Sequence, residues 1–456
     1  MGMSIPRIVT IPICLGRQAL WLLALLLLVS TGCATYADRL VEVRRLFASG
    51  NLAQADVQLE KGLRRRPDRD VIKLDRSIIQ LASGKPREAE QTLREIRDRF
   101  DHLEQPAIAE KALSALTDAN QIAYDGEDYE KVLTRVFLAL SNLMTDGQDA
   151  GAYALQVADK QQQIINAGID KEGNNPKLTY QRVAVGPYLH GALREETHAN
   201  YDDVARSRAM VCSWQPDFPY GAQDLERARY GRHSAPGNGV LYVFALVGLG
   251  PHKEETAEVA TTVSLLIADR ILSVAGKHTL PPTIAPVKVP KVVLTPCSVH
   301  AIHLAVDGRP AGQTATITDI GHMAVEQYAA IYPRVIAEAV VRRVVKKAVI
   351  VGAKEATGTK RGSLANVGLD VAGIAWEATE SADTRCWGLL PDRIQVLRLE
   401  LPAGRHQLSL SAAGATGRVL GRPAMQSVTI ENGRNTYVLA NFPDAELVGS
   451  ILTNRQ

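Results

Sequence analysis

One short segment brings charged, thiol and aromatic side chains together: Asp383-Thr384-Arg385-Cys386-Trp387. A neighbouring guanidinium stabilises a thiolate, so Arg385 could tune the reactivity of Cys386. Asp383, Arg385 and Trp387 could also form a recognition loop. The alternative is a structural turn, in which Asp383 caps the backbone, Arg385 pairs with a carboxylate and Trp387 fills the end of a sheet. We favour the structural turn.

No other residues have the spacing of a known catalytic or metal site. His300 and His303 are three residues apart in a predicted strand, so their side chains point to opposite faces and cannot share one ion. The sequence has no GxGxxG, GxxxxGKS/T, HExxH or GxSxG motif. We therefore expect no metal, no cofactor and no catalytic residue.

The composition is that of a globular protein. Of the 456 residues, 46% are hydrophobic and 22% are charged, and the net charge is +3. These values exclude a disordered chain and a polytopic membrane protein. The small net charge and the 5% of aromatic residues argue against nucleic-acid binding.

Residues 1–32 have the pattern of a lipoprotein signal peptide. Basic residues precede an apolar run at 19–29, which is shorter than the ~20 residues of a bilayer-spanning helix. Ser30-Thr31-Gly32-Cys33 follows and resembles the bacterial lipobox, in which small residues precede a cysteine that receives acyl chains such as palmitate. Leu is more usual than Ser30 at its position. The alternative is an ordinary secretory signal cleaved near Ala34.

Cys33 is therefore the predicted lipidation site, and it would tether the protein to a membrane. An Asp after this cysteine tends to retain Gram-negative lipoproteins at the inner membrane. Ala34 in this position indicates the outer membrane, and we expect the protein to face the periplasm. Cys212, Cys297 and Cys386 remain in the mature chain, and they allow at most one disulfide.

Two amino-terminal units repeat with the tetratricopeptide period. Gly50 is followed five residues later by Ala55, and Gly84 by Ala89, so the two glycines are 34 residues apart. Glycine lets the chain turn between antiparallel helices. Alanine fits where two helix backbones approach closely. This spacing predicts two stacked helical hairpins.

Two looser units follow along the chain. Gly147 is followed by Ala152, and Gly126 is followed by Lys131 in the alanine position. Residues 33–230 are thus predicted to form a tetratricopeptide-like helical domain, whose stacked hairpins would offer a groove to a partner protein. A plain helical bundle is the alternative.

Residues 236–456 are predicted to form a β-rich domain, which makes the fold class α+β. The apolar run 240–247 indicates a buried strand, and 288–294 and 300–306 indicate two more. A helix at about 323–353 interrupts the strands.

Two turns near the carboxyl terminus predict β-hairpins. Pro402-Ala403-Gly404 divides the strands of 393–410. Asn432-Gly433, a strong two-residue hairpin signal, divides those of 428–439.

The long predicted helix carries basic residues on one face and valines on the other. The basic face could contact anionic lipid or an acidic partner. The alternative is that the valine face packs on a sheet while the charges are solvated, and we favour it. The basic residues are Arg342, Arg343, Lys346 and Lys347.

Three segments carry a family resemblance: 124–130 (YDGEDYE), 235–243 (APGNGVLYV) and Asp383-Thr384-Arg385 with Trp387. Together with the lipobox and the repeats, they resemble a poorly characterised group of Gram-negative outer-membrane lipoproteins. The resemblance implies a scaffold protein, and some similar lipoproteins are associated with factors that regulate peptidoglycan synthesis. It implies no catalytic residue.

We expect a non-enzymatic, lipid-anchored scaffold that binds an envelope protein, with peptidoglycan as a second candidate partner. The alternative is a cell-wall or glycan-binding protein or enzyme. That alternative requires a deep cleft in residues 236–456 that contains two carboxylates or a tuned Cys386.

Overall fold

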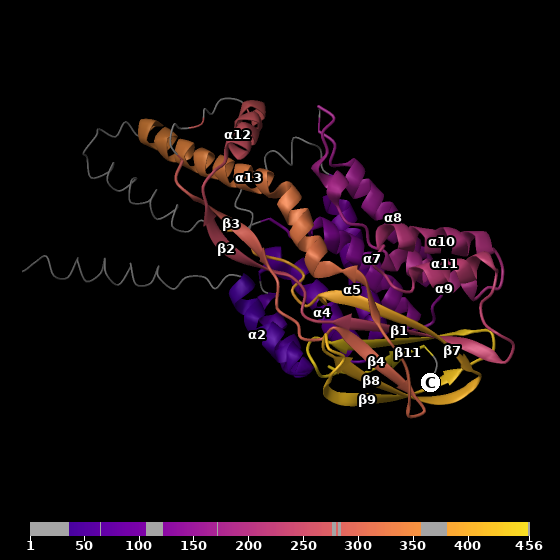
Figure 1. The fold of residues 1–456 in the computed structure, drawn as a ribbon. Helices are drawn as coiled ribbons and strands as arrows, with labels where there is room; N and C mark the ends of the chain where they lie inside the picture. Colours follow the sequence, from indigo (N-terminus) through magenta and orange to yellow (C-terminus); the bar gives the residue numbers. More distant parts are fainter. Residues whose placement is uncertain are drawn as a thin grey trace, which may run out of the picture.

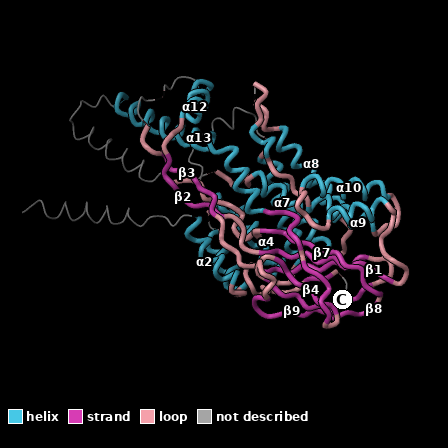
Figure 2. Tube along the Cα trace, viewed as in Figure 1, coloured by secondary structure: helices cyan, strands magenta, loops and turns pink. Residues whose placement is uncertain are grey.

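The computed structural model describes residues 36–63, 65–105, 122–170, 172–275, 280, 284–356 and 381–454. The predicted signal peptide and Cys33 lie outside these residues. The α+β prediction is confirmed, because helices occupy most of the first half of the chain and several sheets follow (Figures 1 and 2). The change from helices to strands falls between Arg229 and Asn238.

The amino-terminal helices pack in chain order, each against the next. Short turns join them into the pairs α2–α3, α4–α5, α7–α8 and α9–α10. The helices are α2 (Tyr36–Ala48), α3 (Leu52–Gly62), α4 (Arg69–Ala82), α5 (Pro86–Leu103), α7 (Asp128–Leu143), α8 (Ala150–Asn166), α9 (Val185–Glu195), α10 (Tyr201–Trp214) and α11 (Gly221–Arg229), with 3₁₀ turns η1 (Arg66–Asp68) and η3 (Pro176–Thr179).

Two sheets stack beneath the helices (Figure 2). The five-stranded sheet has the order β11-β10-β1-β7-β6, and only β1 and β10 run parallel. The antiparallel four-stranded sheet has the order β5-β4-β8-β9. The strands are β1 (Asn238–Val247), β4 (Ala301–Val306), β5 (Arg309–Gln313), β6 (Ala315–Asp319), β7 (Arg393–Pro402), β8 (Gly404–Ala413), β9 (Val419–Ile430), β10 (Asn435–Phe442) and β11 (Leu452–Thr453).

Strand β1 is buried on both faces, which explains its unbroken apolar sequence. Tyr242 and Phe244 belong to the core shared with the helices. Leu241 and Val243, which point to the opposite face, belong to the core between the two sheets. The fold is therefore three-layered, with helices on one face of the five-stranded sheet and the second sheet on the other.

Both predicted carboxyl-terminal hairpins are wrong. β7 pairs with β1 and β6, whereas β8 pairs with β4 and β9, so Pro402-Ala403-Gly404 carries the chain from one sheet to the other. Asn432-Gly433 likewise connects β9 of the four-stranded sheet to β10 of the five-stranded sheet. A turn sequence fixes the local reversal of the chain but not which strand edges then form hydrogen bonds.

A projecting arm extends from the body (Figure 1). It consists of α12 (Thr262–Ala275), the two-stranded sheet of β2 (His252–Glu258) and β3 (Val287–Val293), and the outer part of α13 (Ile320–Ala356). The predicted helix at 323–353 is confirmed, but α12 is a second helix that the sequence analysis missed. In the parts of the chain described here, no helix combines the length and apolar character needed to cross a bilayer.

Candidate functional site

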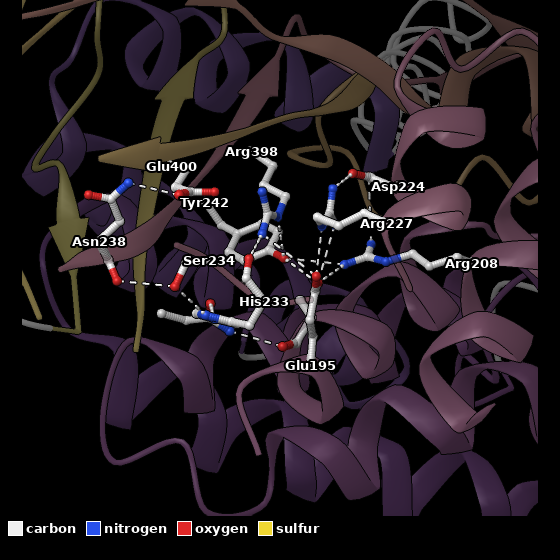
Figure 3. Close-up of polar contacts among 12 residues, drawn as sticks. Glu195, Arg208, Asp224, Arg227, His233, Ser234, Asn238, Tyr242, Arg398 and Glu400 are labelled. Carbon is white, nitrogen blue, oxygen red and sulfur yellow. Dashed lines mark hydrogen bonds and ion pairs between the residues drawn. The ribbon is translucent and has the colours of Figure 1, made fainter. Parts of the chain in front are cut away.

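Buried charges gather between helices α9–α11 and the five-stranded sheet (Figure 3). Glu195 ends α9, and its side chain is fully buried. Its carboxylate oxygens lie 2.7 Å from Arg227 Nε and 3.2 Å from Arg208 Nη2. Arg398 of β7 approaches to 3.6 Å, and the Tyr242 hydroxyl of β1 donates at 3.2 Å. We call these residues the Glu195 cluster: Glu195, Arg208, Asp224, Arg227, Tyr242 and Arg398.

The arginines keep Glu195 ionised. Burial alone would raise its pKa, but Arg208, Arg227 and Arg398 lower it to about 2. Asp224 offsets part of the remaining positive charge, because its Oδ1 lies 2.6 Å from Arg227 Nη1. The cluster therefore ties three helices to β7 through buried ion pairs and to β1 through the hydrogen bond of Tyr242.

His233 and Ser234 extend this network toward the start of β1 (Figure 3). His233 Nε2 lies 2.9 Å from Asn435 Oδ1, and His233 Nδ1 lies 3.0 Å from Ser234 Oγ. A serine nucleophile needs a histidine that accepts its proton. Here the Ser234 hydroxyl donates to the Asn238 carbonyl at 3.1 Å. The pair therefore orients backbone in this structure and does not form a nucleophile–base arrangement.

A second buried polar group lies where the Asp383–Trp387 segment meets the amino-terminal helices. The backbone N–H of Trp387 donates to Glu130 Oε1 at 2.7 Å, and the backbone N–H of Leu389 donates to Asp75 Oδ1 at 2.8 Å. Hydroxyl groups of Tyr124 and Tyr36 donate to the same two carboxyl groups. We call these residues the Asp75 cluster: Tyr36, Asp75, Tyr124 and Glu130.

The two carboxyl groups of the Asp75 cluster have pKa values close to neutral pH. Burial raises the pKa of Asp75 to about 7, although hydrogen bonds from Tyr36 and Leu389 oppose the shift. Burial and the neighbouring Glu127 raise the pKa of Glu130 to about 7, against the hydrogen bond from Trp387. Both groups hold one loop against the helices.

The Asp383–Trp387 segment faces inward. Trp387 is fully buried, and its ring centroid lies 5.3 Å from that of Phe137. Arg385 is 3% exposed, pairs with Asp383 through two hydrogen bonds and donates to main-chain carbonyls of the amino-terminal region. The segment has the character of a structural turn, although Trp387 fills the helical core and not the end of a sheet. Arg385 and Trp387 offer no recognition surface in this structure.

Cys386 lacks the setting of a reactive thiol. It is fully buried, and burial together with Glu130 raises its pKa above the ordinary value. Arg385 directs its guanidinium to Asp383, Pro67 and Ile122, and therefore does not supply the tuning that the sequence suggested. All three cysteines in the described ranges are free thiols.

The repeat residues divide into two groups. Gly50, Gly84 and Gly147 each have positive φ in the turn of a helical pair, which glycine adopts without strain. Ala55 and Ala89 are fully buried at the fourth residues of α3 and α5.

The other two repeat positions differ from this pattern. Ala152 is exposed, because α8 begins three residues after Gly147, whereas α3 and α5 begin two residues after their glycines. Tyr153 takes the buried fourth position instead. Gly126 has positive φ just before α7, and a Cβ there would collide with Phe100. Lys131 is buried and pairs with Glu104 at 3.3 Å.

The predicted basic face of the long helix is not a continuous charged surface. Arg343 donates to the carbonyls of Ala285 and Pro286, and Lys346 is 9% exposed. Arg342 is half-buried and Lys347 is exposed. On the other face, Val340 and Val341 pack in the core of the arm.

Two hollows on the described surface lie outside both clusters. One has a volume of about 10 Å³, lies beside Glu127, Asp128 and Lys253, and has room for about one water. The other is an open depression on α10 and α11 with one carboxylate, that of Glu226. The enzymatic alternative needs a deep cleft with paired carboxylates or Cys386, and neither hollow supplies one.

The residues that form the Glu195 cluster were not found by sequence reasoning. They come from α9, α10, α11, β1 and β7, so no local spacing connects them. The available signals are isolated polar side chains in apolar settings, such as Tyr242 within 240–247 and Arg398 between Leu397 and Leu399.

Within the described ranges, no three His, Cys, Asp or Glu side chains are placed to hold a metal ion.

Two of the three segments behind the family resemblance meet in the structure. Glu130, at the end of 124–130, accepts the Trp387 N–H, and the Arg385 guanidinium lies 5.3 Å from the ring centroid of Tyr124.

No protein-family description, curated protein or solved structure matches the chain.

Proposed function

We propose that this protein is a lipid-anchored scaffold of the bacterial outer membrane. In this proposal, acyl chains on Cys33 hold it at the periplasmic face, and its amino-terminal helices bind a partner protein of outer-membrane or cell-wall biogenesis. The helices would form a tetratricopeptide-like array, and the two sheets would support it from one side.

The repeated helical hairpin carries this proposal. Gly50 and Gly84 turn the chain with the same φ of 78° at positions 34 residues apart. Ala55 and Ala89 are completely buried at equivalent helix positions. Consecutive pairing of helices through α11 supports an array that extends beyond these two units.

The polar interior also favours binding over catalysis. Glu195 pairs with arginines, and Asp75 and Glu130 accept backbone N–H groups, so both clusters serve internal contacts. Exposed apolar side chains remain on the helices, among them Val57 of α3 at 55% exposure and Leu155 of α8 at 50%. Burying such apolar side chains against another protein would favour association.

Crosslinking in living cells tests the scaffold proposal. A photoreactive amino acid replaces Val57 or Leu155 in the full-length chain, and adducts are identified by mass spectrometry. Met425 of β9, at 57% exposure, is the matched control on the outer sheet. We expect envelope-protein adducts from the helical positions and fewer from Met425. Equal background labelling at all three positions would contradict the proposal.

The anchor is tested separately. Cys33→Ser should abolish incorporation of labelled palmitate and release the protein from the membrane fraction, because the thiol is the attachment point for the lipid. The intact mass of the mature wild-type chain provides a second measurement. A mature chain without acyl groups would remove the anchor from the proposal.

A further inference from the structure

The projecting arm has its own apolar core and a fixed base. Ala268 and Leu272 of α12 pack with Val289 of β3 and with Val340 of α13. At the base, Arg44 of α2 donates to the carbonyl of Gly250 at 3.0 Å and to the hydroxyl of Thr295 at 2.8 Å.

Gly250 precedes β2 and Thr295 follows β3, so these hydrogen bonds attach the arm directly to α2. Lys253 of β2 also pairs with Glu127, next to the start of α7. The arm therefore has a defined direction relative to the first helix.

The proposed anchor lies very close to α2. Cys33 is separated from Tyr36, the first residue of α2, by two residues. A fully extended chain spans at most about 3.6 Å per residue, so the two Cα atoms are within about 11 Å of each other. With acyl chains on Cys33, the amino-terminal end of α2 lies at the bilayer surface. That end of α2 and the arm lie on the same side of the body, at the left in Figure 1.

The arm exposes apolar side chains at its tip. Val263 and Leu266 of α12 are 56% and 68% exposed, and the adjacent Val259 is 66% exposed. The opposite face of α12 packs in the arm core through Ala268 and Leu272.

The outer part of α13, which packs against α12, also carries net positive charge, with Lys347 exposed and Arg342 half-buried. Residues 334–356 of α13 contain six Lys or Arg residues and two Asp or Glu residues. Exposed apolar side chains beside net positive charge are the combination found in interfacial membrane helices.

We propose that α12 docks on the membrane and places Val259, Val263 and Leu266 in the headgroup region of a leaflet that contains anionic phospholipid. This inference rests on the proposed lipid anchor at Cys33. The acyl chains supply the attachment, and the arm supplies a second, non-covalent contact. Two contacts fix the orientation of the helical array above the bilayer, whereas a single tether allows it to rotate.

Photocrosslinking in nanodiscs tests this contact. The mature lipoprotein carries a photoreactive amino acid at position 266 and is reconstituted with or without phosphatidylglycerol. Tyr230, 79% exposed and directly after α11, is the matched position outside the arm. We expect lipid adducts at 266 to exceed those at 230 several-fold and to fall when phosphatidylglycerol is omitted. Adducts only with protein, or equal lipid adducts at both positions, would overturn the proposal.

A double variant gives a second measurement. Val263→Asp with Leu266→Asp should lower lipid adducts formed from a photoreactive group at position 259 several-fold, and Tyr230→Asp should leave them unchanged. Both side chains are exposed, so circular dichroism should show the wild-type fold. Intact mass distinguishes the two ideas: a chain without acyl groups removes the proposed anchor, whereas an acylated chain without adducts at 266 rejects the arm contact alone.

Discussion

Glu195 is surrounded by Arg208, Arg227 and Arg398, whereas Asp75 and Glu130 accept hydrogen bonds from tyrosine hydroxyls and backbone N–H groups. All three carboxyl groups are buried. Their pKa values nevertheless differ, at about 2 for Glu195 and about 7 for Asp75 and Glu130. The difference shows that burial alone does not determine ionisation, because a full positive charge compensates a carboxylate more strongly than neutral donors do.

The two regions consequently join different parts of the fold. The Glu195 cluster joins helices to the sheet through ion pairs. Removing a single partner of a buried ion pair strongly destabilises the fold, because the other charge stays buried without compensation. The Asp75 cluster holds a loop to the helices through hydrogen bonds that do not require two opposite charges. Three variants and one labelling experiment test whether this contrast is correct.

The largest effect is expected from Glu195→Gln. The substitution keeps the side-chain volume but leaves three arginines without their central carboxylate, so the free energy of unfolding should fall by about 3–5 kcal/mol. Urea denaturation at pH 7 measures this loss. Asp203→Asn removes a carboxylate from an exposed ion pair with Arg206 and should change stability little. Equal losses in the two variants would contradict the assignment.

A smaller loss is expected from Gly388→Ala in the loop held by Asp75 and Glu130. A Cβ at this position collides with Leu40 of α2, and overpacking of this kind costs about 1–3 kcal/mol. Thermal or urea unfolding measures the change. Gly151→Ala in α8 is the control, because the nearest side-chain atom lies 4.0 Å from the added Cβ. That control should be neutral or slightly stabilising.

Asp75→Asn should change the pH dependence of stability. The folded-state pKa of about 7 lies above the ordinary aspartate value, so the folded protein binds a proton more tightly than the unfolded chain does. Asp75 therefore disfavours folding increasingly as pH rises from about 4 to 7, and the variant lacks this contribution.

The free energy of unfolding of Asp75→Asn relative to wild type should increase by about 1 kcal/mol or more between pH 5 and pH 8, since each pKa unit corresponds to about 1.4 kcal/mol. Urea titrations at the two pH values measure it. A difference that is the same at both pH values would show that Asp75 is not protonated in the folded protein at pH 5.

The smallest effect is expected from a labelling experiment on the Asp383–Trp387 segment, which leaves the sequence unchanged. Cys386 is fully buried and its pKa is raised, so a maleimide should label it only after unfolding. Cys212 and Cys297 are partly exposed and should react first. Peptide mapping after timed labelling identifies each site. Early labelling of Cys386 in the native protein would show that the Asp383–Trp387 loop opens.

The sequence by itself determined the features that depend on neighbouring residues. The spacing of Gly50 and Gly84 located two helical turns, and the apolar run at 240–247 located a strand buried on both faces. The long helix near 323–353 was likewise visible in the local pattern. Steric limits on φ and the periodicity of apolar residues act over a few residues, so one chain segment contains the necessary information.

Only the tertiary structure decided which segments meet. Pro402-Ala403-Gly404 and Asn432-Gly433 turn the chain as expected, but the strand pairing across each turn depends on edges supplied by β1, β4 and β6. The low pKa of Glu195 depends on three arginines that lie 13 to 203 residues away in sequence. Hydrogen-bonding edges and charges interact through space, so their partners are fixed only when the layers pack together.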